Sequence, residues 1–327
     1  MTTDAQTRDA PSSRAAVVFN PAKVNTQRLR DQVAAREKSL GWGPSTWHET
    51  SAADDGRGAA QDAAAHHPDV VLVAGGDGTL RVAAEELAPA GIPIALIPVG
   101  TGNLFARNLH LPLNNLPLAV RTAFEGTDRR VDIGEATLTL EDGGVQIHAF
   151  LVMAGVGLDA NMAANTNARV KKRLGWVAYS DPIARSVFGN HQFTLRYGLD
   201  DQPEQEMKAH TVIVGNCGTL TAGLLLLPDA VIDDGILNAV AFRPKGGAGW
   251  TKIGYGLALN RFFHRTRFGR VLDLFLPTSR TLRYTSGRRL TVRFDVPEQI
   301  QLDGDPFGKV SGAVLEVRHR GLAIRTP

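Results

Sequence analysis

The stretch from Val70 to Gly78 constrains the fold of this chain more than any other. Val70-Val71-Leu72-Val73 is an unbroken apolar run, which is typical of a strand buried on both faces of a parallel sheet. Gly75-Gly76-Asp77-Gly78 follows, and residues from Thr79 to Leu87 carry apolar side chains at helical spacing. A strand, a glycine turn and a helix N-terminus form an anion site, because backbone N–H groups and the helix dipole face the ligand. The same four residues also fit a tight turn without a ligand.

A second turn of this kind follows the next apolar run. Ile94-Ala95-Leu96-Ile97 leads into Pro98-Val99-Gly100-Thr101-Gly102-Asn103. Two neighbouring strands that end in glycine turns place both turns at the carboxyl edge of one sheet, where open α/β folds bind ligands. Neither turn matches GxGxxG or GxxxxGK[ST], so a Rossmann dehydrogenase and a Walker-type ATPase are disfavoured.

Size and composition set broad limits. The 327 residues are enough for two domains, and 36 basic against 33 acidic residues give a net charge of +3. That mild excess is compatible with phosphate ligands or an anionic membrane surface. The one cysteine, Cys217, excludes an internal disulfide framework, suits a reducing cytoplasm, and is expected to be buried. No apolar run approaches the roughly 18 residues needed to span a bilayer.

The pattern of elements predicts two domains after a flexible tail at residues 1–14. We expect residues 15–130 to form an α/β domain with a parallel sheet, and residues 131–327 to form an antiparallel, β-sandwich-like domain. The last strands are expected to pack back on the first domain, and a helical insertion is expected from Met162 to Phe188. The predicted strands of the second domain include Gln146–Met153 and Met207–Gly215. The cleft between the domains is the default position for a site.

Taken together, the motifs resemble those of the bacterial diacylglycerol kinase and sphingosine kinase superfamily of soluble lipid kinases. Asn20-Pro21, the two glycine turns, Gly155 to Ala160, Lys171 to Tyr179, Asp233 to Leu237 and Leu302 to Asp305 carry this resemblance. A GGDG turn alone would be weak evidence, since NAD kinases and phosphofructokinases share it. The whole set covers Val17 to about Val317 and is specific.

The resemblance implies a fold like that of NAD kinase and diacylglycerol kinase, with ATP and Mg²⁺ in the cleft and a lipid hydroxyl as acceptor. It implies that Asp303 is the general base, and that Asp305 stands where the family usually has Glu. It also implies that Asp234 and the carbonyls of Val231 and Ile236 hold a structural Mg²⁺. The residues it assigns to the nucleotide are Asn20, Pro21, Ala22, Lys23, Val24, Thr50, Gly75, Gly76, Asp77, Gly78, Thr79, Leu80, Gly100, Thr101, Gly102 and Asn103.

The chain departs from the family pattern in two places. Leu104 replaces an Asp that is common in the diacylglycerol branch, and Arg81-Val82 replaces the common Asn-Glu. Neither departure changes Asp303, the proposed general base.

Phosphoryl transfer requires a positioned phosphate, neutralised charge and an acceptor for the hydroxyl proton. Asp77 is therefore either a Mg²⁺ ligand or a turn cap. Asp303 is either a general base or part of a hairpin turn, since Asp-Gly is a common turn dipeptide. Asp305 could raise the proton affinity of Asp303 or help to hold metal. The Asp233-Asp234-Gly235 segment is either a metal loop or an ordinary loop.

The sequence thus predicts an ATP- and Mg²⁺-dependent lipid kinase that phosphorylates diacylglycerol or a related lipid. A soluble NAD-kinase-type enzyme and a non-catalytic lipid-binding regulator are the alternatives. Two segments that mix cations with aromatic or apolar residues, Arg169–Arg173 and Arg261–Arg270, predict peripheral docking on the anionic inner face of the membrane or, alternatively, solvated surfaces. No nucleic-acid motif accompanies them. The sequence leaves a homodimer open.

Overall fold

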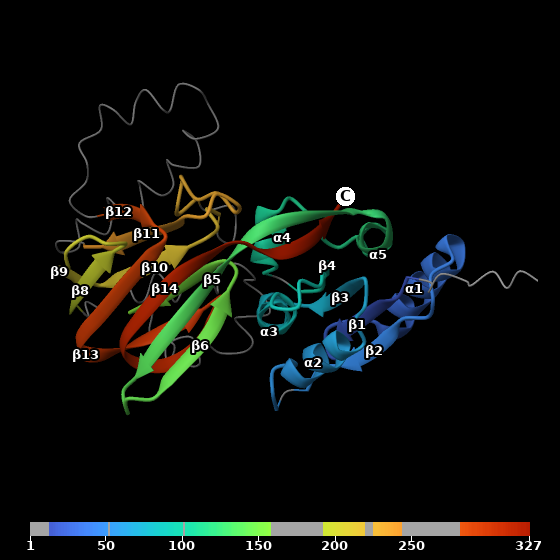
Figure 1. The fold of residues 1–327 in the computed structure, drawn as a ribbon, viewed down its shortest axis with the longest axis horizontal. Helices are drawn as coiled ribbons and strands as arrows, with labels where there is room; N and C mark the ends of the chain where they lie inside the picture. The colour runs from blue at the N-terminus through green and yellow to red at the C-terminus, as the bar shows by residue number, and fades with distance from the viewer. Residues whose placement is uncertain (1–12, 52, 101, 158–191, 220–224, 244–281) are drawn as a thin grey trace, which may run out of the picture.

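A computed structural model describes residues 13–51, 53–100, 102–157, 192–219, 225–243 and 282–327 (Figure 1). Thr101, the helical insertion predicted between Met162 and Phe188, and the two cationic segments lie outside these ranges. Within the described part of the chain, no helix is long and apolar enough to cross a membrane.

The N-terminal region alternates strands with helices, as predicted. The four strands of this region run parallel in the order β4-β3-β1-β2. β3 pairs with β4 from Val71↔Ile94 to Gly75↔Pro98, so the two strands end side by side. The elements are β1 (Ala15–Phe19), α1 (Thr26–Leu40), β2 (Thr46–Glu49), α2 (Arg57–Ala65), β3 (Val70–Gly75), α3 (Asp77–Leu87), β4 (Ile94–Pro98), α4 (Leu104–Asn108) and α5 (Leu116–Glu125). The two glycine turns therefore lie side by side.

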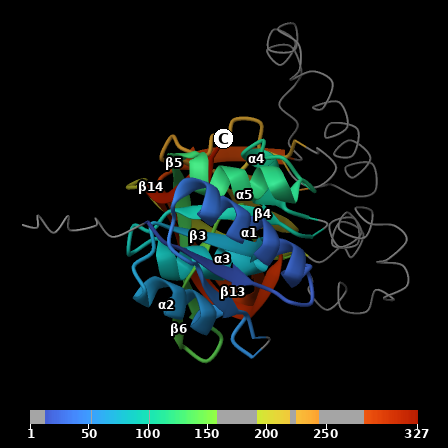
Figure 2. The same ribbon diagram turned by 90° about the vertical axis from the view of Figure 1, so that its right-hand side faces the viewer.

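Helices cover both faces of this parallel sheet (Figure 2). Alternate residues of one strand point to opposite faces, so Val71 and Val73 pack against α2 and α3 while Val70 and Leu72 pack against α1 and α5. All four side chains are at most 2% exposed. Burial on both faces explains why the strand reads as a continuous apolar run.

Local signals fix the ends of the flanking helices. The Asn25 side chain accepts a hydrogen bond from the Arg28 N–H at 3.0 Å, which caps the N-terminus of α1. Gly41 ends that helix with φ of 71°, a left-handed conformation that glycine adopts without steric cost. Asn115 caps α5 in the same way as Asn25 caps α1.

The second region is antiparallel and forms a sandwich-like core, which confirms the predicted fold class. Strand order runs β12-β11-β10-β7-β13-β14; β8 also pairs with β13 and β9 with β8, while β5 also pairs with β14 and β6 with β5. The strands are β5 (Thr127–Leu140), β6 (Val145–Phe150), β7 (Met153–Val156), β8 (Phe193–Leu199), β9 (Gln205–Ala209), β10 (Thr211–Gly215), β11 (Leu237–Phe242), β12 (Leu282–Gly287), β13 (Arg289–Leu302) and β14 (Asp305–Thr326).

Two of the predicted strands are each divided in the structure. The predicted strand from Gln146 to Met153 is β6 and β7, because the chain turns at Leu151-Val152 to leave β5 and join β10 and β13. The predicted strand from Met207 to Gly215 is β9 and β10, which pair with different neighbours on either side of His210. Both segments keep strand-forming residues through the change of partner, so the sequence does not mark where it occurs.

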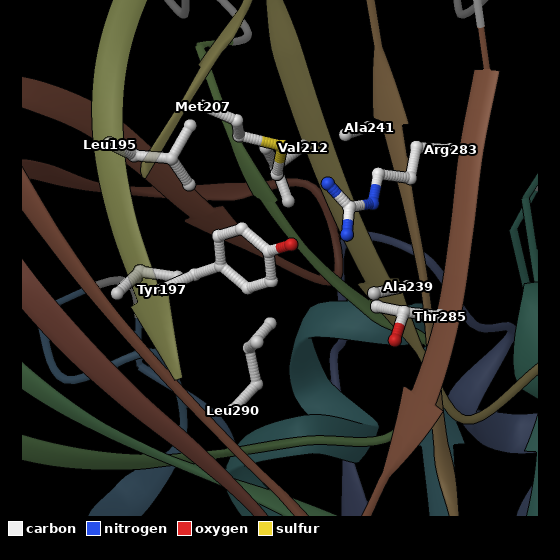
Figure 3. A pocket seen from close by; sticks show the side chains of 10 residues that line it. Leu195, Tyr197, Met207, Val212, Ala239, Ala241, Arg283, Thr285 and Leu290 are labelled. Atoms are coloured by element: carbon white, nitrogen blue, oxygen red, sulfur yellow. The ribbon is translucent and has the colours of Figure 1, made fainter. Parts of the chain in front are cut away.

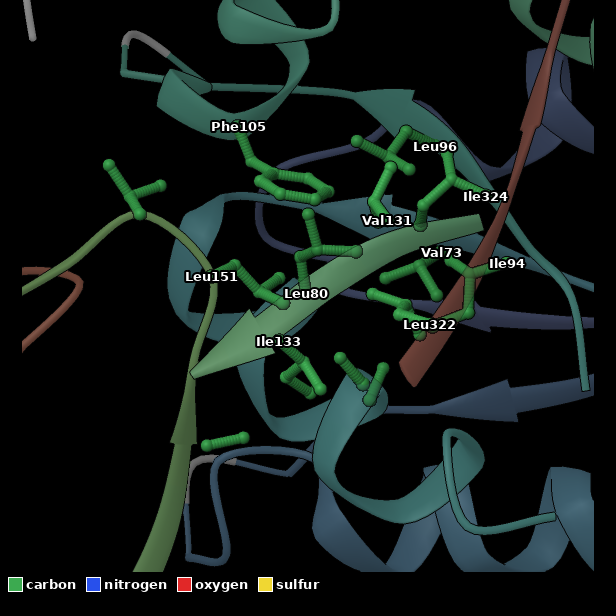
Figure 4. Packing of buried hydrophobic residues seen from close by; sticks show 14 of the residues in the cluster. Val73, Leu80, Ile94, Leu96, Phe105, Val131, Ile133, Leu151, Leu322 and Ile324 are labelled. Carbon is green, nitrogen blue, oxygen red and sulfur yellow. The ribbon is translucent and has the colours of Figure 1, made fainter. Parts of the chain in front are cut away.

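Strand β14 connects the two regions. It pairs with β13 near its start and with β5 along its length, and Ile324 pairs with Ile94 of β4 near its end. Its residues Leu322 and Ile324 are fully buried beside Val131 of β5 and Ile94 (Figure 4). The strand that starts at the Asp303-Gly304 turn therefore ends in the core of the parallel sheet.

Candidate functional site

Asp303 lies in a two-residue turn between β13 and β14. Asp303 and Gly304 have φ of 51° and 94°, and Leu302 pairs with Asp305 across the turn. Positive φ at both central residues is the geometry that favours Asp-Gly in hairpins. The predicted hairpin is therefore present, and it aims the Asp303 side chain at the segment between β6 and β7.

Three backbone N–H groups donate hydrogen bonds to the Asp303 carboxylate. Leu151 donates to Oδ2 at 2.8 Å, while Val152 and Met153 donate to Oδ1 at 2.8 and 2.9 Å. The Asp303 N–H in turn donates to the Met153 carbonyl at 2.8 Å. These bonds hold the carboxylate in one orientation. They could not be predicted, because residues 146–153 have the pattern of a single strand.

Burial raises the pKa of Asp303 to about 6, against an ordinary value of 3.8. The three N–H donors and the nearby Arg81 charge lower that pKa and offset only part of the burial effect. A carboxyl group with this pKa is ionised at neutral pH and still has appreciable proton affinity, which suits a general base. Asp305 was the predicted source of higher proton affinity at Asp303, but burial is what raises this pKa.

The Asp305 carboxylate instead contacts helix α3. Its Oδ2 accepts hydrogen bonds from Arg81 Nη2 at 3.2 Å and Arg81 Nε at 3.4 Å. The position that a Cβ atom on Gly78 would take lies 2.9 Å from the same oxygen. Glycine at position 78 therefore allows a carboxylate of the second region to approach the first turn of α3.

Arg81 is a functional candidate that the sequence showed only as a departure from the family pattern. Its side chain is 4% exposed, with Nη1 3.7 Å from Glu85 and the guanidinium 4.9 Å above the Phe307 ring. A buried cation needs such partners to offset its lost hydration. The helical spacing of Leu80, Ala83, Ala84 and Leu87 gave no sign that Arg81 is also buried.

Asp77 joins the two glycine turns. It is the first residue of α3, and its Oδ1 accepts a hydrogen bond from the Phe105 N–H at 3.4 Å, at the start of α4. Burial raises the pKa of Asp77, while the N–H groups of Phe105, Leu104 and Asn103 act to lower it. Asp77 thus caps the second glycine turn rather than the turn in which it lies. A Cβ atom on Gly102, in that second turn, would lie 2.8 Å from Asp77 Oδ2.

The Asp303 turn lies at the N-terminus of α3. Asp305, two residues after Asp303, has its Oδ2 2.9 Å from the position that a Cβ atom on Gly78 would take, and it pairs with Arg81 of the same helix. Burial first, and then the negative charges of Asp303 and Asp77, raise the pKa of the Cys217 thiol, which is 2% exposed as predicted.

Several other residues predicted to hold a nucleotide lie on loops that follow β1 and β2 of the same sheet. The Asn20 N–H donates to the Ala74 carbonyl at 3.0 Å, and Asn20 Oδ1 accepts from the Ala22 N–H at 3.0 Å, which shapes the loop through Val24. Lys23 Nζ lies 3.4 Å from the position of a Cβ on Gly76. Thr50 donates its N–H to the Phe19 carbonyl at 2.9 Å, at the end of the neighbouring strand. The Leu80 side chain is 5% exposed and belongs to the core, and its part in the nucleotide site stays a prediction.

The N-terminus of α3 fits a phosphate chain. No side chain caps this helix, since its N-cap residue is Gly76. A Cβ atom built on Gly100 would lie 3.8 Å from the Gly76 Cα, so the two glycine turns are close together. The backbone N–H groups of the first helical turn, the helix dipole and the nearby Lys23 cation form a suitable environment for anionic oxygens. The carboxylates of Asp77 and Asp305 at the same place are hard oxygen ligands of the kind that Mg²⁺ prefers.

The predicted Mg²⁺ loop around Asp234 lies apart from this cluster. Asp234 Oδ1 accepts the Ile236 N–H at 2.9 Å, Val231 is 48% exposed, and Asp233 pairs with Arg129 at 2.7 Å. Across the described residues, no three His, Cys, Asp or Glu side chains gather closely enough to hold a metal. A site built from one carboxylate and two carbonyls stays a prediction.

Asp132 is a buried carboxylate that the sequence analysis missed. It is fully buried on β5 and accepts hydrogen bonds from the Gly235 N–H at 2.6 Å and the Arg320 N–H at 2.7 Å. His319 Nδ1 lies 2.9 Å from its Oδ1. Asp132 therefore ties the Asp234 loop to β5 and β14, which is a structural role.

A small cavity lies within the second region, and none of the carboxylates of the cluster lines it (Figure 3). Tyr197 of β8, Met207 of β9 and Val212 of β10 line it, and the Arg283 guanidinium lies 5.5 Å from the Tyr197 ring. Its volume of about 20 Å³ has room for roughly one water. We therefore do not assign an acyl chain to it.

Comparisons with known proteins agree with this geometry. Residues 14–136 match the diacylglycerol kinase catalytic domain, and residues 151–253 match the YegS C-terminal NAD kinase beta sandwich-like domain. A Pseudomonas fluorescens protein named "Probable lipid kinase YegS-like" is 30% identical over 312 residues, covering 89% of this chain and 98% of its own. The "Diacylglycerol kinase" of Bacillus subtilis is 26% identical, covering 94% of each chain.

Solved structures share the fold. The crystal structure of a diacylglycerol kinase from Bacillus anthracis has a TM-score of 0.70 at 19% identity, covering 97% of this chain and 98% of that one. Yeast NADH kinase has a TM-score of 0.54 at 10% identity, covering 96% of this chain and 82% of its own. The chain thus belongs to the family of diacylglycerol kinases and YegS-like lipid kinases.

Proposed function

We propose that this protein is an ATP- and Mg²⁺-dependent lipid kinase that transfers the γ-phosphate to a hydroxyl of diacylglycerol or a related lipid. One observation carries the proposal: the Asp303 turn of the second region lies against the N-terminus of α3 in the first. Transfer requires an anion site and a base on the two sides of one reaction centre.

The N-terminus of α3 and Lys23 bind and orient the phosphate chain in this proposal. The backbone N–H groups from Gly76 to Thr79 direct their dipoles at the anion, while Asp77 holds the second glycine turn in place. ATP supplies the phosphoryl group, and Mg²⁺ offsets its charge through hard oxygen ligands, for which Asp77 and Asp305 are the candidates.

Asp303 accepts the proton of the attacking hydroxyl at a carboxylate oxygen. Its pKa of about 6 leaves it ionised at neutral pH, and the N–H groups of Leu151, Val152 and Met153 keep the side chain in one orientation. Arg81 holds Asp305, and so the strand after the turn, against α3. Arg81 is thus a positioning residue.

A lipid acceptor also requires contact with a membrane. We therefore propose a cytoplasmic protein that associates peripherally with the inner face, through the cationic segments Arg169–Arg173 and Arg261–Arg270. Flotation with phosphatidylglycerol vesicles in low and high salt tests this association separately from catalysis.

The direct test combines an acceptor panel with one substitution. Radiolabelled ATP is supplied with diacylglycerol, sphingosine or NAD in mixed micelles, and products are separated by thin-layer chromatography. We expect labelled lipid from diacylglycerol or a relative, and loss of turnover with retained ATP binding in Asp303→Asn. Phosphorylation of NAD instead would support a metabolite kinase. ATP binding without transfer to any acceptor would support a regulator.

A further inference from the structure

Arg107 is an exposed cation beside the second glycine turn. It lies on α4, and its Nε donates a hydrogen bond to the Gly102 carbonyl at 2.8 Å. Within the described part of the chain, its two Nη groups take part in no hydrogen bond or ion pair. The guanidinium is therefore held at one nitrogen and presents the other two, in a fixed planar geometry, at the surface.

The bond to Gly102 places this guanidinium near the N-terminus of α3. A Cβ atom on Gly102 would lie 2.8 Å from Oδ2 of Asp77, the first residue of that helix. Burial raises the pKa of Asp77, and the Arg107 charge is among the groups that act to lower it. Gly102 thus links the Arg107 side chain to the helix N-terminus that we assign to phosphate.

Two other cations have contacts at this N-terminus, and they are placed differently. Arg81 is 4% exposed, and carboxylates already surround its guanidinium. Lys23 follows β1, and its Nζ lies 3.4 Å from the position of a Cβ on Gly76. Arg107 follows β4, on the opposite side of the first glycine turn, because β3 lies between β1 and β4.

The strand order indicates which end of a nucleotide lies near Arg107. The parallel strands run in the order β4-β3-β1-β2, and β14 of the second region pairs with β4. The transferable phosphate must face Asp303, which the second region carries. The rest of the nucleotide therefore extends toward the loops after β1 and β2, and its terminal phosphate lies on the β4 side.

Helix α4 is also held to the second region. Asn108, next to Arg107, accepts the Thr219 N–H at Oδ1 at 3.1 Å and donates from Nδ2 to the Thr219 carbonyl at 2.8 Å. These bonds keep α4 on the side of the first region that faces the second (Figure 1). An arginine fork in this position can bind two oxygens of one phosphate at once.

We infer that the two Nη groups of Arg107 bind the terminal phosphate of the nucleotide, so that Arg107 distinguishes ATP from ADP. The inference rests on the proposed kinase function and adds to it the residue that recognises the transferable phosphate. Lys23, on the other side of the turn, binds phosphates that ATP and ADP share. During transfer the Arg107 contact also stabilises the charge of the transition state.

Calorimetric titration with ATP and with ADP, both with Mg²⁺ and without lipid, tests the inference. Arg107→Met is expected to weaken ATP binding about tenfold to thirtyfold and ADP binding less than about threefold, because only ATP has the terminal phosphate. Arg107→Lys should recover part of the ATP affinity through its charge. Lys23→Met should weaken both nucleotides alike. Arg121→Met, which removes an exposed arginine of α5, is the control and should leave both affinities unchanged.

A purely structural role of Arg107 would give a different result. Loss of the bond to Gly102 would disturb a turn that both nucleotides contact, so ATP and ADP binding would weaken by the same factor. Equal weakening, or unchanged ATP affinity, in Arg107→Met would overturn the inference and leave the kinase proposal standing. Selective loss of ATP binding in Lys23→Met instead would overturn it by assigning the terminal phosphate to Lys23.

The same titration separates the inference from the proposed function. A wild type that binds neither nucleotide would overturn both. The expected loss of ATP binding in Arg107→Met, together with no lipid phosphorylated by the wild type, would support the inference and overturn only the lipid acceptor.

Discussion

Arg81 and Asp305 are 224 residues apart in the chain, yet Arg81 donates from both Nη2 and Nε to one oxygen of Asp305, at 3.2 and 3.4 Å. Arg81 belongs to α3 of the first region and Asp305 begins β14 of the second. The guanidinium is 4% exposed and also lies 3.7 Å from Glu85. This bridge sets the distance between the phosphate-binding turn and the Asp303 carboxylate.

Removing the Arg81 charge is expected to slow turnover more than it weakens nucleotide binding. Arg81→Met leaves Asp305 without its partner, so the turn that carries Asp303 is no longer held at α3. We expect kcat to fall about tenfold to a hundredfold, with KM for ATP changed less than threefold. Steady-state kinetics with saturating lipid measure both values, and Arg81→Lys is expected to recover part of kcat by restoring the charge.

Arg57→Met is the matched control for Arg81. Arg57 pairs with the same Glu85 at 2.6 Å, but none of its recorded contacts reaches Asp305. It should lower the melting temperature and leave kcat nearly unchanged. Equal losses of kcat in Arg57→Met and Arg81→Met would mean that Arg81 supports only the fold.

Gly78→Ala is expected to separate stability from activity. A Cβ at this position would lie 2.9 Å from Asp305 Oδ2, so the carboxylate must move, and its side chain is 46% exposed and free to turn outward. Alanine is favoured over glycine in a helix by about 0.5–1 kcal/mol, so the melting temperature should not fall. We expect kcat to decrease about tenfold.

The control for Gly78→Ala is Gly198→Ala, where an added Cβ meets only ordinary contacts at 3.7 Å. It should leave kcat unchanged. Full activity in Gly78→Ala would contradict a requirement for the present position of Asp305.

The pKa of Asp303 predicts how kcat/KM falls at acidic pH, which we call the acid limb. Burial raises this pKa to about 6, and a general base is active only when ionised. The value of kcat/KM should therefore fall as pH decreases through about 6, whereas a base with the ordinary value of 3.8 would stay active to much lower pH. Rates measured from pH 5 to 8 at constant ionic strength test this, and Asp305→Asn should keep the same limb at lower overall rate. A flat profile down to pH 5 would exclude Asp303 as the base.

The parallel sheet and its two glycine turns were predictable because their signals are local. The buried run at Val70–Val73 and the turns after β3 and β4 are each contained in fewer than fifteen residues. Resemblance to a family added Asp303, which lies in a hairpin turn that the sequence alone reads as ordinary.

The environment of Asp303 could not be predicted, because it depends on contacts between distant segments. The donors at Leu151–Met153 arise from a change of strand partner, and apolar patterning does not reveal where one strand ends and the next begins. Arg81 and Asp132 are buried among long-range partners, whereas charged residues in a sequence are ordinarily assigned to the surface. Their positions follow from packing rather than from propensity.

Glu85 predicts how stability depends on acid. Burial alone raises its pKa, but the His148 and Arg57 side chains and the Ala149 N–H outweigh burial and lower it to about 2, from an ordinary value of 4.5. A lowered carboxyl pKa means that the folded state favours the ionised form, so its stabilisation is complete above pH 4.5 and is lost as pH falls toward 2. The full effect is of the order of 3 kcal/mol, from about 1.4 kcal/mol per pKa unit.

Urea unfolding of Glu85→Gln between pH 2.5 and 7 measures this contribution. The variant should be less stable than wild type at pH 7, and the difference should shrink toward acid, since protonation removes the same charge from the wild type. Glu86→Gln is the control, because Glu86 is equally exposed and also pairs with Arg57 but is not bonded to β6. A constant difference between wild type and Glu85→Gln across this range would mean that Glu85 acts through packing alone. If the difference in unfolding free energy shrinks toward acid, the charge of Glu85 stabilises the contact between α3 and β6. That contact supports the segment whose N–H groups bind Asp303.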